Sequence, residues 1–140
     1  MRKHSVILAL AVSVLSANTF AAVPKKLSVF PEGERLIYSR LIDSYRHNNL
    51  TQVIQQRILL EKNYPASIHL DNAYYLTGLL QFQNARYGEA VRDFNIVTDR
   101  FPKSNKRPGA MFAMAVTYDR LGLKPQMRRV MDTLMREYPG

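Results

Sequence analysis

The chain has 140 residues and a formal net charge of +9 at pH 7, and this length is typical of one domain. It contains no Cys, which excludes a disulfide framework, a zinc site built on thiolates and a lipid anchor attached to Cys. Hydrophobic residues make up 46% of the chain and charged residues 22%, a balance that excludes an intrinsically disordered protein.

Residues 1–22 have the three parts of a secretory signal peptide. Two basic residues come first, the apolar run 6–15 follows, and small residues precede an expected cleavage after Ala21 or Ala22. A bilayer span needs about 20 apolar residues, so this run alone is too short to be one. We therefore predict a cleaved leader, a linker over 23–33 and a mature chain without a membrane span. An uncleaved helix that anchors the chain in a membrane is the alternative.

The leader also predicts where the protein acts. Its removal takes away two basic residues and no acidic ones, which leaves a net charge of +7. We expect the mature chain to be exported across the inner membrane and to reside in the periplasm. The absence of Cys suits such an oxidising compartment.

From residue 34 on, the sequence repeats with a period of 37 residues. The clearest markers are three aromatic residues that each precede a Pro: Tyr64-Pro65, Phe101-Pro102 and Tyr138-Pro139. Other positions in the same register hold similar residues: Tyr38, Tyr75 and Phe112, and also Leu60, Val97 and Leu134. Within each period, apolar residues are spaced by three and four, which is typical of amphipathic helices.

These spacings predict three helix hairpins, over 34–65, 71–102 and 108–139. Each hairpin ends at its Pro, because Pro cannot continue a helix and pushes the preceding residue out of the helical region. Gly78 and Ala115 occupy equivalent positions in the second and third hairpins, where a small side chain lets two helices approach closely. Such hairpins bury their apolar faces on their neighbours, so we predict an all-α solenoid domain over 34–140.

The second hairpin carries Gly78, Tyr87, Ala90 followed four residues later by Phe94, and the closing Pro102. This pattern resembles the tetratricopeptide (TPR) repeat. The third hairpin is similar, with Ala115, Tyr118, Gly122 and Pro139. The segment 73–102 also resembles the TPR region of the Tol–Pal accessory proteins and of outer-membrane assembly lipoproteins. The resemblance spans roughly 34–139 and implies a TPR-like solenoid that binds other proteins.

The sequence offers no catalytic, cofactor-binding or metal-binding motif that we can defend. It has no Gly-rich phosphate loop, no G-x-S-x-G motif and no nucleophile beside a base. His47 and His69 have no metal-ligand spacing, so we interpret them as surface turn residues. We therefore predict a non-enzymatic protein without a cofactor.

Two surfaces are candidates for binding a partner. In a TPR superhelix the first helix of each hairpin lines the concave groove. The aromatic and polar residues that we expect to face this groove are Tyr38, Tyr45, Arg46, Tyr75, Phe82, Gln83, Phe112 and Arg120. Such a groove suits a peptide with apolar anchors and an acidic flank. The alternative is that these aromatic residues form the core between hairpins. We expect the Tyr45, Phe82 and Arg slots to be the more exposed.

The last predicted helix is the second candidate surface. It carries Met127, Met131 and Met135, and Met is common at adaptable binding surfaces. We expect either self-association there, giving a homo-oligomer, or a partner that completes the solenoid. Basic residues also cluster in the loop between the second and third hairpins, at Arg100, Lys103, Lys106 and Arg107. An acidic partner or an anionic envelope surface fits them better than nucleic acid, because no aromatic residue is interleaved.

Together these observations predict a secreted TPR adaptor that binds a protein or peptide in the cell envelope. Two alternatives stay open. One is a self-assembling structural subunit of an envelope complex, and the other is an accessory regulator that docks on a cell-wall enzyme.

Overall fold

The computed structural model describes residues 32–140. The predicted signal peptide and nearly all of the predicted linker lie outside these residues. The described part of the chain contains six helices and no strand: α1 Glu32–Arg46, α2 Leu50–Asn63, α3 Leu70–Gln83, α4 Tyr87–Arg100, α5 Arg107–Arg120 and α6 Lys124–Glu137. Over this range, none of the helices has both the length and the apolar character that crossing a bilayer requires.

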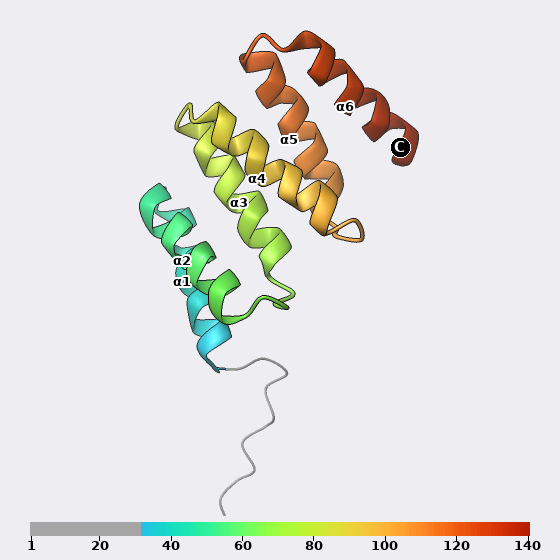
Figure 1. Ribbon diagram of the computed structural model, residues 1–140. Coiled ribbons are helices and arrows are strands. Elements are labelled where there is room, and N and C mark those ends of the chain that lie inside the picture. The colour runs from blue at the N-terminus through green and yellow to red at the C-terminus, as the bar shows by residue number, and fades with distance from the viewer. Residues whose placement is uncertain (1–31) are drawn as a thin grey trace, which may run out of the picture.

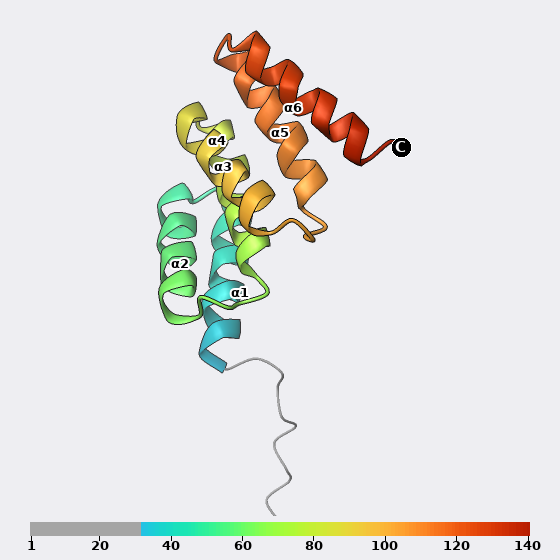
Figure 2. The ribbon, with the colours of Figure 1, turned by 45° about the vertical axis from the view of Figure 1, so that its right-hand side comes forward.

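The six helices form three antiparallel hairpins, α1/α2, α3/α4 and α5/α6, which stack one after another along the chain (Figure 1). Figure 2 shows the same succession after a rotation, with α6 at one end of the stack. From α2 on, each helix begins 37 residues before its equivalent in the next hairpin. The predicted fold, an all-α solenoid of three hairpins, is confirmed.

Local sequence signals set the ends of these helices. The helices α2, α4 and α6 end before Tyr64, Phe101 and Tyr138, the aromatic residues that precede Pro. Each hairpin turn contains one residue in the left-handed region, at Asn48 (φ 53°), Ala85 (φ 57°) and Gly122 (φ 73°). These turn residues are again 37 apart, so the repeat governs backbone conformation as well as apolar spacing.

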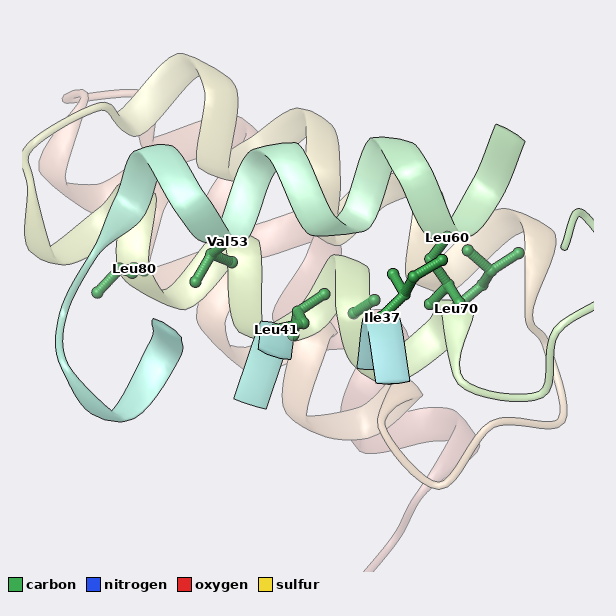
Figure 3. Packing of buried hydrophobic residues seen from close by; sticks show 7 residues of the cluster. Ile37, Leu41, Val53, Leu60, Leu70 and Leu80 are labelled. Atoms are coloured by element: carbon green, nitrogen blue, oxygen red, sulfur yellow. The ribbon is translucent and has the colours of Figure 1, made fainter. Parts of the chain in front are cut away.

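The core lies between successive hairpins and within them. A first cluster joins α1, α2 and α3, and its buried members are Ile37, Leu41, Val53, Leu60, Leu70, Ala73 and Leu80 (Figure 3). A second cluster joins α3, α4 and α5, and its buried members are Tyr74, Ala90, Phe94, Val97, Ala110 and Met114. The first helix of each later hairpin therefore completes the core of the hairpin before it. The last helix, α6, has no buried residue.

Gly78 shows why the equivalent position needs a small side chain. A Cβ atom placed on Gly78 would lie only 2.7 Å from Cε1 of Phe94, whose ring fills this space. In the first hairpin the positions equivalent to Gly78 and Phe94 are the buried Leu41 and the half-buried Arg57. In the second hairpin a small side chain thus faces a large one, as close packing requires.

Candidate functional site

Three of the predicted groove residues, which we call the first ladder, occupy equivalent positions in the three hairpins: Tyr38, Tyr75 and Phe112. The next hairpin covers two of the three. The ring of Tyr38 stacks on His69, with 4.0 Å between ring centroids, and its hydroxyl oxygen accepts a 2.6 Å hydrogen bond from Asn72. A Cβ atom on Gly109 would lie 3.0 Å from the hydroxyl of Tyr75. His69 is accordingly half-buried at the start of α3, rather than a solvated turn residue.

Phe112, the third member of this ladder, is 54% exposed. No further hairpin packs on it within residues 32–140. This position therefore takes part in the contact with the next hairpin in the first two hairpins, and it is exposed in the third. Tyr38 and Tyr75 thus pack between hairpins, as the alternative interpretation expects, whereas Phe112 is accessible on the surface.

A second ladder of equivalent positions, Tyr45, Phe82 and Asp119, is aromatic in the first two hairpins and acidic in the third. Tyr45 is half-buried against the first cluster, and Phe82 is half-buried against the second cluster. The Phe82 ring also contacts the ring of Tyr87 across the hairpin turn, at 5.4 Å between centroids. In the third hairpin the two equivalent positions are Asp119 and Lys124, which form an ion pair. Tyr45 and Phe82 are thus less exposed than the sequence led us to expect, and the last hairpin is polar at its turn.

The polar slots Arg46, Gln83 and Arg120 are exposed, each in the last turn of its helix. Arg46 lines a polar hollow of about 520 Å³ between α1 and α2. A partner for these three side chains stays a prediction.

The last hairpin contains the apolar hollow that brings the two predicted surfaces together. Four residues of α5 and two of α6 line a hollow of about 220 Å³: Phe112, Ala115, Val116, Asp119, Met127 and Met131. We call these six residues the open face. Met135, two residues before the end of α6, is 57% exposed. The predicted groove residue Phe112 and the predicted terminal-helix residues Met127 and Met131 thus belong to one surface.

The 37-residue register explains where this hollow comes from. The six positions of the open face correspond in the second hairpin to Tyr75, Gly78, Leu79, Phe82, Ala90 and Phe94. There the side chains pack in or against the second cluster, to which α5 contributes Ala110 and Met114. The sequence predicts two separate surfaces at Phe112 and at the Met residues, and the structure joins them. The open face is the equivalent of a surface that α5 covers one hairpin earlier.

Two of the four residues of the predicted basic loop form ion pairs. Arg100 donates a 2.6 Å hydrogen bond to Glu61 of α2, and Arg107 donates to Glu137 and, at 3.1 Å, to the hydroxyl of Tyr138. These contacts raise the pKa of both guanidinium groups further above their usual range. Of the four residues, Lys103 and Lys106 remain without a carboxylate partner in the described part of the chain.

Glu61 of α2 connects the first hairpin to both helices of the second, α3 and α4. Its carboxylate accepts hydrogen bonds of 2.6 Å from the Tyr74 hydroxyl and from Arg100. Burial alone would raise the pKa of Glu61, but these two hydrogen bonds, together with the charges of Arg100 and Arg57, hold it below its usual value. The ionised Glu61 therefore stabilises the contact between the first and second hairpins.

A second polar cluster lies in a hollow of about 360 Å³ where α2, α3 and α4 meet. Burial raises the pKa of Asp93 there, against the opposing effect of the Arg57 charge. Buried oxygens of Asp93 and Gln81 have no protein hydrogen-bond partner. Groups of this kind commonly bind ordered water. Among residues 32–140, no three His, Cys, Asp or Glu side chains are grouped so that they could hold a metal ion.

A family comparison agrees with this architecture. The tetratricopeptide repeat model matches residues 72–104 and 109–140, which are the second and third hairpins. Comparison with curated proteins gives no match. The two matched segments are therefore similar to tetratricopeptide repeats, and the described part of the chain folds as a TPR-like solenoid. Such repeats typically form non-catalytic scaffolds that bind other proteins through extended surfaces.

Proposed function

We propose that the chain is a secreted, non-enzymatic TPR adaptor that binds a protein partner in the cell envelope. The observation that carries this proposal is the open face, an apolar hollow on a repeat of a family that binds proteins. The leader sequence supports the envelope as the compartment. The resemblance of 73–102 to the Tol–Pal accessory proteins and outer-membrane assembly lipoproteins favours a partner from one of those systems.

The chemistry of the open face supports binding of a protein. Phe112 in α5 and Met135 in α6 each expose more than half of a large apolar side chain. Contiguous exposed apolar surface marks interaction sites in soluble proteins. Aromatic and Met side chains are enriched at the centre of such interfaces, and the Met side chains adapt to the partner's shape.

Site-specific crosslinking tests this proposal. A photoreactive phenylalanine analogue replaces Phe112 in the full chain. The chain is produced with its leader in bacterial cells that have an inner and an outer membrane. Ile68 is the matched control position, since it is a large apolar residue, 67% exposed, in the loop between α2 and α3. We expect an envelope protein to be crosslinked through position 112 and not through position 68.

The outcomes separate the candidate functions. A Tol–Pal or outer-membrane assembly component at position 112 supports the adaptor and names its system, and a cell-wall enzyme there favours the accessory regulator. Recovery of the chain crosslinked only to itself favours the self-assembling subunit. Equal capture through both positions, or none through position 112, contradicts a binding role for the open face.

Export is tested separately on the same cells. We expect periplasmic chain whose mass corresponds to cleavage after Ala21 or Ala22. Full-length chain retained with the membranes would instead support the uncleaved anchor.

A further inference from the structure

We propose that the open face binds an α-helix of a partner protein, which lies on α5 and α6 as α5 lies on α3 and α4. The partner helix has a small side chain near its start and acidic side chains in its last turn. This inference rests on the proposed function and specifies the partner. It follows from the repeat register, from the direction of the helices and from the charges around the hollow.

The repeat register indicates which kind of element packs on the open face. At the equivalent surface of the second hairpin, the occupant is α5, which buries Ala110 and Met114 in the second cluster. At the equivalent surface of the first hairpin, the occupant is α3, which buries Ala73 and Leu80 in the first cluster. Both occupants are helices, so the third surface of the same design fits a helix.

Both occupants also carry Ala at the same position. Ala73 and Ala110 are 37 residues apart, and each is 0% exposed. No larger side chain is used there in either interface. Each Ala is the fourth residue of its helix, so we expect a small residue near the start of the partner helix.

The direction of the partner helix follows from the packing of α3. Figure 3 shows Leu70, at the start of α3, beside Leu60 near the end of α2, and Leu80 near the other end of α3 on the side of Val53. The helix α3 thus runs antiparallel to α2. An occupant of the open face in the same direction begins over Phe112 and ends near Lys124, at the start of α6.

The charges at that end distinguish the last hairpin from the other two. Apolar residues occupy two positions in the second helix of the earlier hairpins, Leu50 and Ile54 in α2 and Tyr87 and Val91 in α4. The equivalent residues in α6 are Lys124 and Arg128. Lys124 pairs with Asp119, whereas Arg128 and the nearby Arg120 pair with no carboxylate of the described residues.

These cations complement the end of an incoming helix. A helix C-terminus carries a partial negative charge from its unpaired carbonyl groups, and acidic side chains in the last turn add to it. Cations at this end of the hollow therefore favour a partner helix whose last turn is acidic. An apolar partner helix would leave Arg128 partly desolvated without a counter-charge, which is unfavourable.

A second copy of this chain fits the open face poorly. The other exposed end of the solenoid is α1, whose positions equivalent to the buried face of α3 are Gly33, Leu36, Arg40 and Asp43. There Arg40 and Asp43 stand where α3 buries Thr77 and Leu80, so α1 lacks the apolar face of an occupant.

Peptide binding to the mature chain tests the inference with defined probes. Two fluorescent peptides copy residues 107–121 and are held helical by a hydrocarbon staple. One carries Arg120→Glu, which makes its last turn acidic, and the other carries Asp119→Lys, which makes it basic. Binding is measured by fluorescence anisotropy at low and high salt.

We expect the acidic peptide to bind more tightly than the basic one by about fivefold or more at low salt, as exposed charge pairs allow. This preference should decrease at high salt because counter-ions screen exposed charges. In the Arg128→Glu variant the preference should reverse. Arg129→Glu is the matched control, since Arg129 is the adjacent exposed Arg and lines a different hollow of α6, so the preference should persist.

Met131→Lys tests the apolar part of the face. Met131 is only half-buried on a helix without buried residues, so we expect the variant to retain its helicity and to lose the binding of both peptides. Sedimentation of the mature chain completes the test. A concentration-dependent mass that Met131→Lys abolishes would identify a second copy as the occupant and overturn the inference.

The inference and the proposed function fail in different ways. If position 112 captures an envelope protein but neither peptide binds, or both bind equally, the adaptor stands and the acidic helix is wrong. If position 112 captures nothing and neither peptide binds, the open face is not a binding site and both proposals fail.

Discussion

The second and third hairpins have the same backbone design, yet they present their equivalent surfaces differently. Phe94 is completely buried in the second hairpin, whereas Met131 at the same position lines a hollow. Tyr75 is half-buried under the start of α5, whereas Phe112 is 54% exposed. The difference shows that exposure in a solenoid depends on the next helix more than on the residue itself.

The sequences of the two surfaces have diverged in keeping with this difference. At the hairpin turn the second repeat has the ring pair Phe82 and Tyr87, and the third has the ion pair of Asp119 and Lys124. The rest of the third surface has stayed apolar. A surface that only met solvent would gain nothing from Phe112 and Met131, so the retained apolar part argues for an occupant.

The largest expected contrast between the two hairpins comes from truncating their equivalent large side chains. Phe94→Ala should lower the free energy of unfolding by about 3–5 kcal/mol, because it leaves a cavity in the second cluster. Met131→Ala should lower it by less than about 1 kcal/mol, since exposed positions contribute little. Urea unfolding measures both. If Phe94→Ala does not fold, Phe94→Leu should still be the more destabilised variant, and equal losses would contradict the contrast.

The second contrast concerns two glycines of the second hairpin. Gly78→Leu should destabilise the protein by about 1–3 kcal/mol, because even its Cβ would lie 2.7 Å from the Phe94 ring. Gly88 is the control, since a Cβ there meets nothing within 4 Å. Gly88→Ala should be neutral or stabilising by up to about 1 kcal/mol. An unchanged melting temperature for Gly78→Leu would argue against the packing of α3 on α4.

The hairpin turns allow a third contrast. Ala85 has a φ of 57° at the position where the third hairpin has Gly122. The left-handed region is unfavourable for Ala by about 1–2 kcal/mol, so Ala85→Gly should raise the stability by about 1 kcal/mol. Gly122→Ala should lower it by a similar amount. Thermal unfolding of the two variants measures this, and a change of the same sign in both would contradict the account.

The smallest expected effect is electrostatic and lies between the first two hairpins. Because the folded-state pKa of Glu61 is lowered, its contribution is present above the unfolded-state pKa of 4.5 and is lost as the pH falls through the folded-state value. Glu61→Gln should therefore destabilise the protein by about 1 kcal/mol or less at pH 7. As the pH falls below 4.5, the difference in stability between the two proteins should decrease steadily. A difference that stays constant from pH 7 to pH 3 would show that ionisation of Glu61 does not matter.

The fold could be predicted from the sequence because its signals are local and repeated. The apolar spacing, the aromatic-Pro pairs and Gly78 each recur or act within one period. The exposure of Tyr38, Tyr75 and Phe112 could not be predicted, since it depends on which helix packs on each of them. The pairing of Arg100 was also missed, because its partner Glu61 lies 39 residues earlier in the chain. The register itself would have joined Phe112 to Met131, but only if the interfaces between hairpins were already known.

The most direct measurement is to supply a helix for the open face within the same chain. A copy of residues 104–122, carrying Arg120→Glu, is appended after Gly140, so that the 37-residue register continues. We predict slower hydrogen exchange of the α6 amides and a melting temperature higher by about 4 °C or more, which corresponds to roughly 1 kcal/mol for a domain of this size. Both gains should disappear in the Met131→Lys background. Exchange and melting identical to those of the unextended chain would contradict the claim that the open face receives a helix.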